Sequence, residues 1–321
     1  MRHGALLPLL LLTSPADATY SIVAADPSSA ASGISIASCV GSLDLDIAYG
    51  TAPGFGSVAA QASVDSQFRG RTRAVELLRL GELPAEILDE ITTTAVDPSP
   101  ASRQYGVAAV QHLSLDGAGS YTGSSTGGWS GGTRGRVDGA EGLRYAAQGN
   151  ILTGPECVAQ SVDGFLAASV PANRGSRHSA NATMAAVLKQ EEECGDIAAR
   201  LMRGLLAAGD NDEGDSRCTN RNPPVPADSA LIRVDLADGT PWLLLSVTNS
   251  YPLNAVDLLY VEYLLWRLEH PCGEIPEPPS DAAAAAASAA AGRAKSKAHS
   301  AKALQLLQDY MAAHDGAAPV I

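Results

Sequence analysis

Two short segments near the start of the chain decide its fold: residues 19–24 read TYSIVA and residues 33–40 read GISIASCV. Both alternate small or polar residues with branched apolar ones, which is the period of a half-buried β-strand. Residues 26–29 between them read DPSS and have the composition of a turn. The pattern therefore predicts a β-hairpin whose first strand begins at Thr19.

Beyond the hairpin, runs of strand pattern alternate with pairs of helices. Further strands are expected over residues 56–62, 104–113, 118–122, 142–148, 229–236 and 241–247. Helices are expected over residues 71–80, 83–93, 155–168, 185–208 and 255–269. The Gly- and Ser-rich residues 123–139 are expected to form a flexible loop. A parallel doubly wound sheet needs a helix after each strand, so this order favours an α+β fold of two antiparallel sheets with helices outside them.

The composition is typical of a globular protein and limits its partners. The chain has 321 residues, of which 45% are hydrophobic and 18% are charged, so it can bury a substantial core. Its formal net charge is −13, which argues against a basic face that holds a nucleic-acid backbone. We therefore expect no nucleic-acid partner. The substrate, a small molecule or a peptide, and self-association as a homo-oligomer are left open by the composition.

Residues 1–18 have the layout of a secretory signal peptide. Arg2 and His3 precede an apolar run at residues 5–12, and the small residues at 16–18 (ADA) supply a cleavage site. The apolar run is shorter than the roughly 20 residues that a permanent membrane helix needs. We therefore expect a secreted or periplasmic mature protein that has no membrane anchor and begins at Thr19.

The folded domain is expected to span residues 19–270. Residues 271–321 are rich in Pro and Ala and are interpreted as a linker with one optional amphipathic helix at the C-terminus. Within the domain, residues 171–183 are interpreted as a surface insertion. Its Asn181 lies in a glycosylation sequon, which is used only in a host that glycosylates exported proteins.

The five cysteines are an odd number for an exported chain, so at least one thiol has no partner within the chain. A Cys194–Cys218 bridge is one hypothesis among many pairings. Cys39 lies on a predicted strand and is interpreted as a small core residue, with a role as nucleophile as the alternative. Neither the cysteines nor the six histidines have metal-ligand spacing, so we expect no metal and no cofactor.

Removal of the leader would change the chemistry of Thr19. A threonine hydroxyl inside a chain is a weak nucleophile because no base accompanies it. An N-terminal threonine carries its own base, since an unperturbed α-amine has a pKa of about 7.7 to 8.0 and lies close enough to accept the hydroxyl proton. The sequence therefore makes Thr19 a candidate nucleophile, although secreted proteins also begin with Thr by chance.

Several short segments together resemble one known family. They are TYSIVAADP at 19–27, GISIAS at 33–38, AQA at 60–62, RG at 69–70, LLRLG at 77–81, TG at 122–123, YAAQGNILTGP at 145–155 and GDSR at 214–217. In this order they are similar to the domain of unknown function 1028 family, over roughly residues 19–270. Members of that family resemble N-terminal nucleophile (Ntn) hydrolases. The resemblance implies a four-layer α/β/β/α sandwich in which the first strand begins with the nucleophile position.

The resemblance and the chemistry of acyl transfer suggest supporting residues. Asn150, with the backbone around Gly149, is the first candidate for the oxyanion donor, although the QGN segment could instead shape the turn before the next helix. Asp26 is a candidate to orient the α-amine, or else simply a turn residue. Gln61 is a buried amide in the site or in the core. Asp215 and Arg217 either bind a charged substrate group or form a surface ion pair.

Two function hypotheses follow. The first is a secreted Ntn-type hydrolase in which Thr19 attacks an amide carbonyl. The second is a non-catalytic extracellular binding or structural domain on the same fold. One departure weighs against the first, because relatives carry acidic residues and a His beside a Pro where residues 247–252 of this chain read VTNSYP.

Overall fold

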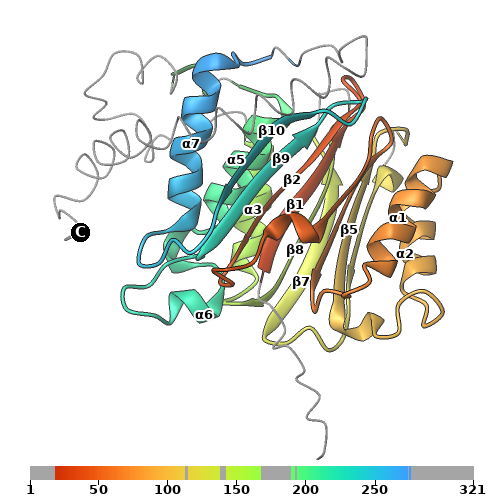
Figure 1. Cartoon of the computed structure of the whole chain (residues 1–321), viewed down its shortest axis with the longest axis horizontal. Helices are drawn as coiled ribbons and strands as arrows, with labels where there is room; N and C mark the ends of the chain where they lie inside the picture. Colours follow the sequence, from red (N-terminus) through yellow and green to blue (C-terminus); the bar gives the residue numbers. More distant parts are fainter. Residues whose placement is uncertain are drawn as a thin grey trace, which may run out of the picture.

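Strands form two sheets at the centre of the molecule (Figure 1). The structure is a computed structural model in which residues 19–112, 115–137, 142–167, 189–191, 194–273 and 275 are described. Across the six-stranded sheet the order is β10 (Pro241–Val247), β9 (Ser229–Asp235), β2 (Ala31–Ser38), β1 (Thr19–Asp26), β8 (Arg144–Leu152) and β7 (Trp129–Arg136). Across the four-stranded sheet it is β3 (Tyr49–Ala52), β4 (Gly56–Ala62), β5 (Arg103–Ala109) and β6 (Ala118–Thr122). Neighbouring strands are antiparallel in both sheets.

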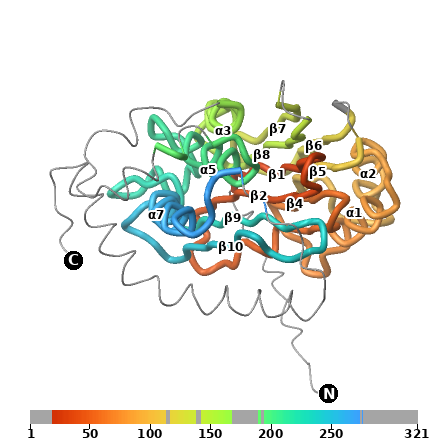
Figure 2. The backbone as a smooth tube through the Cα atoms, turned by 90° about the horizontal axis from the view of Figure 1, so that it is seen from above, coloured from red at the N-terminus to blue at the C-terminus, as the bar shows by residue number. Residues whose placement is uncertain are grey.

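Helices cover the outer face of each sheet, so the chain is arranged in four layers (Figure 2). The helices on the six-stranded sheet are α3 (Glu156–Leu166), α5 (Ile197–Ala208) and α7 (Ala255–Glu269). Those on the four-stranded sheet are α1 (Arg69–Leu80) and α2 (Pro84–Ile91). The expected pair of antiparallel sheets with helices outside them is confirmed.

The strand β1 shows why these residues fold in this way. All eight of its residues are buried, because the strand is central and both of its faces are covered. Tyr20 and Ile22 pack into the apolar cluster under α3, α5 and α7, whereas Val23 and Ala25 pack into the cluster between the two sheets. A third cluster lies between the four-stranded sheet and α1 and α2. The alternation in residues 19–26 thus serves two different cores.

One expected loop is a strand. Residues 123–139 were predicted to be a flexible loop, but β7 forms the edge of the six-stranded sheet within them. Its glycines lack the apolar alternation of a half-buried strand, so periodicity could not reveal it. Gly131 and Gly132 pair with Gly149 and Gln148 of β8, and this partner strand supplies the register. The short strand β3 also has no counterpart among the expected elements.

The helix expected over residues 185–208 is shorter where it is described. α5 begins at Ile197, and the carboxylate of Asp196 caps it by accepting a hydrogen bond from the Ala199 N–H at 2.9 Å. Residues 194–195 are not helical. An aspartate whose side chain caps a helix favours a helix start at that residue. α5 therefore does not extend toward the N-terminus beyond Asp196, although the apolar spacing in the sequence does.

Two disulfides are present, and they differ from the expected pairing. Cys39 is bonded to Cys218 and Cys194 is bonded to Cys272, so the Cys194–Cys218 hypothesis is wrong. Cys218 lies in the short helix α6 (Ser216–Thr219), which the fold brings against the end of β2. Because Cys39 is oxidised, it is not an alternative nucleophile in this structure. Cys157 is a free thiol, and burial raises its pKa.

Some expectations fall outside the described residues. These are the leader at 1–18, the sequon at Asn181 with its insertion, and the tail beyond residue 275. Among the described residues, no helix combines the length and the hydropathy needed to span a membrane.

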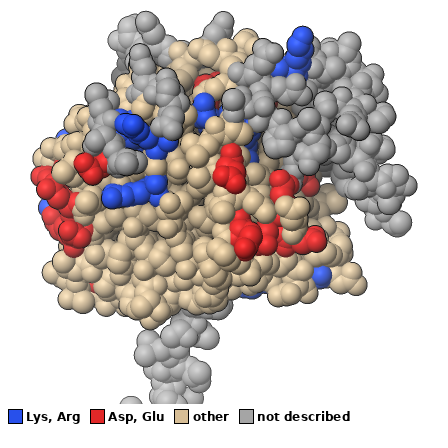
Figure 3. All heavy atoms as spheres, turned by 180° about the vertical axis from the view of Figure 1, so that it is seen from behind, with Lys and Arg blue, Asp and Glu red and all other residues tan. Residues whose placement is uncertain are grey.

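Charged side chains are unevenly distributed on the face opposite to that of Figure 1. Figure 3 shows acidic side chains at the edge where α1 and α2 lie and in further groups toward the other side of the same face, with a small group of basic side chains elsewhere on it. The helices α1 and α2 carry four acidic residues, of which Glu76 and Glu90 form ion pairs with Arg73 and the other two are Glu86 and Asp89. Any site that favours an anionic ligand must therefore depend on local cations.

The Cys39–Cys218 disulfide is expected to stabilise the fold strongly, because its two cysteines are 179 residues apart in the sequence and the bond restricts the unfolded chain. Replacing both by alanine should lower the free energy of unfolding in urea by about 2 to 5 kcal/mol. Cys157→Ala is the control, since it removes a buried sulfur but no bridge, and it should cost less. Equal losses in the two variants would contradict this prediction.

Candidate functional site

A row of polar residues crosses the six-stranded sheet at the end where β1 begins. Each of five adjacent strands contributes one residue that pairs directly with its neighbours, in the order Ser229, Ser38, Thr19, Asn150 and Ser130. Directly paired residues point to the same face of a sheet. That face looks toward the four-stranded sheet, because Ser21, two residues along β1 from Thr19, contacts Gln61 of β4.

Thr19 is held at the centre of this row. It is 4% exposed, and its hydroxyl lies 3.4 Å from the hydroxyl of Ser38, to which it donates. Its carbonyl oxygen accepts a hydrogen bond from Nε2 of Gln61 at 3.2 Å. On the other side it pairs with Asn150, which is fully buried. The first residue of the central strand is therefore fixed by contacts to three strands.

Below the row, four buried groups link the two sheets. The Ser21 hydroxyl donates to Oε1 of Gln61 at 2.6 Å and accepts from Nε2 of Gln148 at 2.7 Å. Nε2 of Gln61 also donates to Oε1 of Gln104 at 3.0 Å. We call Ser21, Gln61, Gln104 and Gln148 the amide network. It is uncharged, so it adds polarity and rigidity to this end without adding a formal charge.

The amide network also ties β8 to the opposite sheet. Nε2 of Gln104 donates to the carbonyl oxygen of Gly149 at 2.7 Å and to that of Gly131 at 3.3 Å. Gly106 of β5 leaves room for this arrangement, because a Cβ at that position would overlap the side-chain amide of Gln148. A single glycine on one sheet therefore permits a glutamine from the other sheet to reach Ser21.

The sheet position immediately beyond the start of β1 is occupied by Asp215. Its backbone forms a β-bridge with Leu152, two residues past Asn150 on β8. Its carboxylate accepts a hydrogen bond from the N–H of Cys39, the residue that follows Ser38 on β2, at 2.6 Å. Asp215 thus lies between β2 and β8, in line with β1, and is completely buried. A strand that began earlier than Thr19 would meet this residue.

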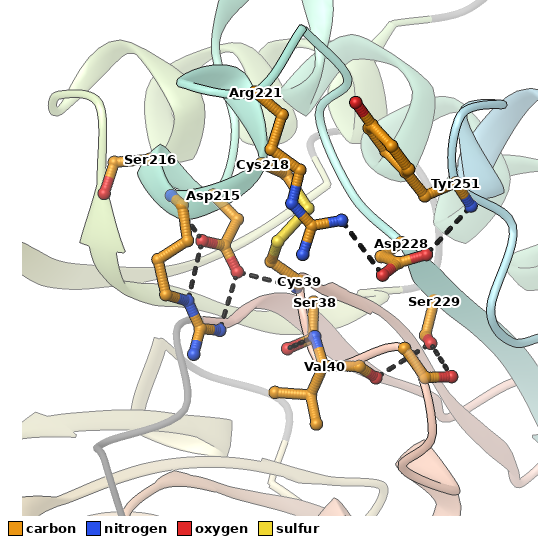
Figure 4. The surroundings of a disulfide bond; sticks show 12 residues. Ser38, Cys39, Val40, Asp215, Ser216, Cys218, Arg221, Asp228, Ser229 and Tyr251 are labelled. Atoms are coloured by element: carbon orange, nitrogen blue, oxygen red, sulfur yellow. Dashed lines mark hydrogen bonds and ion pairs between the residues drawn. A yellow bond between two sulfur atoms is a disulfide. The ribbon is translucent and has the colours of Figure 1, made fainter. Parts of the chain in front are cut away.

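An arginine neutralises this buried carboxylate. Nε and Nη2 of Arg217 donate to the two oxygens of Asp215 at 3.2 and 2.9 Å, and the backbone N–H of Arg217 donates to Oδ1 at 3.0 Å. The neighbouring Cys218 is covalently joined to Cys39. Figure 4 shows Asp215 on one side of this disulfide and the pair of Arg221 and Asp228 on the other.

Four of the five candidate residues lie together. Thr19, Gln61, Gly149 and Asn150 meet at the start of β1. Residues 148–150 belong to β8 and not to the turn before α3, so the alternative interpretation of this segment as turn residues is wrong. Gly149 lies between two paired strands, where backbone N–H groups serve the ladder, and a Cβ there would overlap Leu152. Its contribution is therefore close packing.

Asp26 does not belong to the site. It lies at the opposite end of β1 from Thr19, roughly 23 Å away at about 3.3 Å per residue. Its carboxylate accepts hydrogen bonds from the backbone N–H and hydroxyl of Ser28 and from the hydroxyl of Ser29. The expectation that Asp26 orients the α-amine is wrong, and the alternative that it holds a turn is confirmed.

Sequence reasoning missed several residues of the site. Ser38, Gln104 and Gln148 take part in it. Ser38 and Gln148 lay in segments that carried the family resemblance, but neither was singled out as a site residue, and Gln104 lay in no such segment. Gln104 at the start of an apolar strand was a signal, because a glutamine on a buried strand requires hydrogen-bond partners. Asp215 was weighed as part of a surface ion pair, but its side chain has 0% exposure and only Arg217 reaches solvent, at 32%.

These features define a class of mixed α/β proteins with two antiparallel sheets, in which a threonine opens the central strand beside a buried amide network. The chain belongs to the Family of unknown function (DUF1028), whose model matches residues 19–253. The crystal structure of protein SPO2555 from Silicibacter pomeroyi, described under the same family, matches with 22% identity and a TM-score of 0.51, over 78% of this chain and 89% of that one. At this identity the likeness concerns the fold alone. No curated protein matches the chain.

Gly106→Ala is expected to lower the free energy of unfolding by about 1 to 3 kcal/mol, because the added methyl group forces the Gln148 amide away from Ser21. Gly195→Ala is the matched control, since the nearest atom to its Cβ would be at 3.8 Å. Urea unfolding measures both. In a Gln148→Ala background the Gly106→Ala change should cost less, and an unchanged cost there would show that the overlap lies elsewhere.

Proposed function

We propose that the protein is an exported Ntn-type hydrolase in which removal of residues 1–18 turns Thr19 into a nucleophile that cleaves an amide bond. The observation that carries this proposal is the position of Thr19. It is the first residue of the central strand, it pairs with Asn150 on one side and Ser38 on the other, and Asp215 occupies the sheet position beyond it. A cut before Thr19 therefore removes no residue from the described ladder.

Two further observations support the proposal. The match to the family model begins at residue 19, the same residue that the leader prediction places at the mature N-terminus. Two disulfides are present among the described residues, and disulfides are typical of proteins in oxidising compartments. Both are consistent with export and with a catalytic domain that starts at Thr19.

The proposed mechanism uses the groups around Thr19. The neutral α-amine accepts the hydroxyl proton, and the hydroxyl oxygen attacks the carbonyl carbon of the amide. The side-chain NH₂ of Asn150 donates to the oxyanion of the tetrahedral intermediate. The α-ammonium then gives its proton to the leaving nitrogen, and the C–N bond breaks. Water, deprotonated by the same amine, hydrolyses the resulting ester and restores Thr19.

The surroundings assist this chemistry by holding the nucleophile still. Gln61 binds the Thr19 carbonyl oxygen, and the Ser38 hydroxyl accepts from the Thr19 hydroxyl. These contacts restrict rotation of the residue that carries both nucleophile and base, which reduces the entropy lost on reaching the transition state. The amide network fixes Gln61 in turn.

Labelling of the mature protein by an acylating β-lactone probe tests the proposal. The protein with Thr19 at its N-terminus and Thr19→Ser should both be labelled, and Thr19→Ala should not. Labelling should increase with pH through about 7.7 to 8.0, because only the neutral amine accepts the proton. Intact mass establishes where the mature chain begins.

Other results would contradict it. A mature N-terminus at any residue other than Thr19 removes the proposed base. Labelling of Thr19→Ala at the same rate would identify a different nucleophile. If intact Thr19 is N-terminal and no labelling occurs, the alternative of a non-catalytic extracellular binding or structural domain is favoured.

A further inference from the structure

The backbone of Ile151 has a conformation that its own side chain disfavours. Its φ is 53°, in the left-handed region, where a β-branched residue is strained. Seven non-glycine residues of the described ranges have a left-handed φ, and Ile151 is the only β-branched one among them. It immediately follows Asn150, the residue of β8 that pairs with Thr19. Strain of this kind persists only where the surrounding structure imposes it.

Ile151 is the extra residue of a β-bulge. Trp129 of β7 pairs with Leu152 of β8. The next residue of β7, Ser130, pairs with Asn150, so one residue of β8 is left over between the two pairs. A bulge of this kind inserts one residue into a strand and changes the direction of the side chains that follow it.

The bulge reverses the alternation of side chains along β8. Ala147 belongs to the apolar cluster under α3, α5 and α7, whereas Gln148 belongs to the amide network between the sheets. Strict alternation would place residue 152 between the sheets as well, beside Asn150. Leu152 instead belongs to the cluster under the helices and lies over Gly149, where a Cβ would be 2.4 Å from the Leu152 Cδ1. The bulge therefore lets Asn150 and Leu152 face opposite sides of the sheet.

Contacts from two other segments hold Ile151 in this conformation. Its N–H donates to the carbonyl oxygen of Gly127 at 3.2 Å, and its carbonyl oxygen accepts from the Ser216 hydroxyl at 2.7 Å. Gly128 packs closely against it, because a Cβ there would lie 2.7 Å from the Ile151 Cα. Ser216 begins α6, next to Asp215 and on the side away from the disulfide (Figure 4). The strained residue is thus held through both of its backbone polar groups.

We propose that Ile151 is a positioning residue, whose strained bulge turns the side chain of Asn150 toward Thr19. The same bulge keeps Leu152 out of the space between the sheets. This inference rests on the proposed function, in which Asn150 is the oxyanion donor. Without the hydrogen bond from Ser216, strain at Ile151 drives the backbone toward an ordinary strand. Burial of Leu152 among apolar side chains resists its turning, so Asn150 turns instead.

Two substitutions at position 151 test the strain. Asparagine accepts a left-handed φ, whereas valine keeps the β-branch and is only slightly smaller than isoleucine. Ile151→Asn is therefore expected to melt at a higher temperature than Ile151→Val. At an unstrained strand position the order is the reverse, since valine favours strands and asparagine does not. A higher melting temperature for Ile151→Val would overturn the inference.

The rate at which the β-lactone probe labels the mature protein tests the positioning role. In the background with Ile151 intact, Ser216→Ala should lower this rate by about tenfold or more, because the oxyanion donor is no longer aimed at Thr19. In the Ile151→Asn background no strain is released, so the same change should lower the rate by less than about threefold. An equal loss in the two backgrounds would contradict the inference.

Ser250→Ala is the matched control. Like Ser216, Ser250 has a hydroxyl that donates to backbone carbonyl oxygens, those of Asp228 and Leu253 at 3.1 and 2.8 Å. Its loss should leave the labelling rate unchanged, and a loss of rate equal to that of Ser216→Ala would overturn the inference. Thermal unfolding shows whether each variant is folded. If Ser216→Ala does not fold, the comparison of asparagine with valine at position 151 still decides.

A measurement without any reaction separates this inference from the proposed nucleophile. In NMR spectra of isotope-labelled mature Thr19→Ala, the side-chain amide signal of Asn150 is assigned by its loss in Asn150→Asp. This signal should shift on Ser216→Ala when Ile151 is intact, and much less in the Ile151→Asn background. If the probe does not label the unmodified protein while this pattern holds, the hydrolase proposal fails and the positioning inference stands. A signal that Ser216→Ala does not move would overturn the inference.

Discussion

The hydrogen bond from the Cys39 N–H to the buried carboxylate of Asp215 holds Asp215 beside the point where the central strand of the six-stranded sheet begins. β2 and β8 flank β1; β2 ends at Ser38, which pairs with Thr19, and β8 continues to Leu152, two residues past the partner of Thr19. Without Asp215, backbone groups there would face an unfilled position. Because the carboxylate is neutralised by Arg217 and the segment is tied by Cys39–Cys218, the position is filled permanently. Thr19 therefore begins β1 next to a sheet position that another segment of the chain already fills.

The register of β1 matters as much as its starting point. A shift by one residue would turn Thr19 to the helical face of the sheet and Tyr20 to the face between the sheets. The amide network opposes such a shift, since Ser21 and the Thr19 carbonyl are both bonded to Gln61 of the other sheet. Buried amides must find partners, so they specify one arrangement where an apolar core would tolerate several.

The space between the sheets is therefore divided. Away from Thr19 it is filled by the apolar cluster that includes Val23, Ala25 and Ile36. At the Thr19 end it holds the amide network and the polar row. The apolar part stabilises the contact between sheets, and the polar part provides hydrogen-bonding groups that a reaction can use. Rigid strands carry Thr19 and Asn150, whereas Arg217 lies in a short segment secured by a disulfide.

The local sequence pattern was sufficient to predict most of the helices and strands. The alternation in residues 19–24 and 33–40 identified the β1–β2 hairpin, and helical spacing identified α1, α2, α3 and α7. These elements follow from hydrophobic period and from turn residues, which act over a few positions. Hydrophobic periodicity did not predict β7, whose glycines are held in the sheet by pairing with β8. It also misplaced the start of α5, where the Asp196 cap overrides the apolar spacing.

The sequence by itself determined that Thr19 opens a buried strand. It also identified Gln61, Gly149 and Asn150 as candidate site residues, because strand pattern and residue chemistry are local properties. Only the tertiary structure decided which groups surround Thr19. In the structure, Ser38, Gln104 and Asp215 lie at the Thr19 end of the sheets. Asp26 lies at the far end of β1, and Cys39 is bonded to Cys218. Contacts between strands depend on register and on the packing of one sheet against the other, which residues distant in sequence settle together.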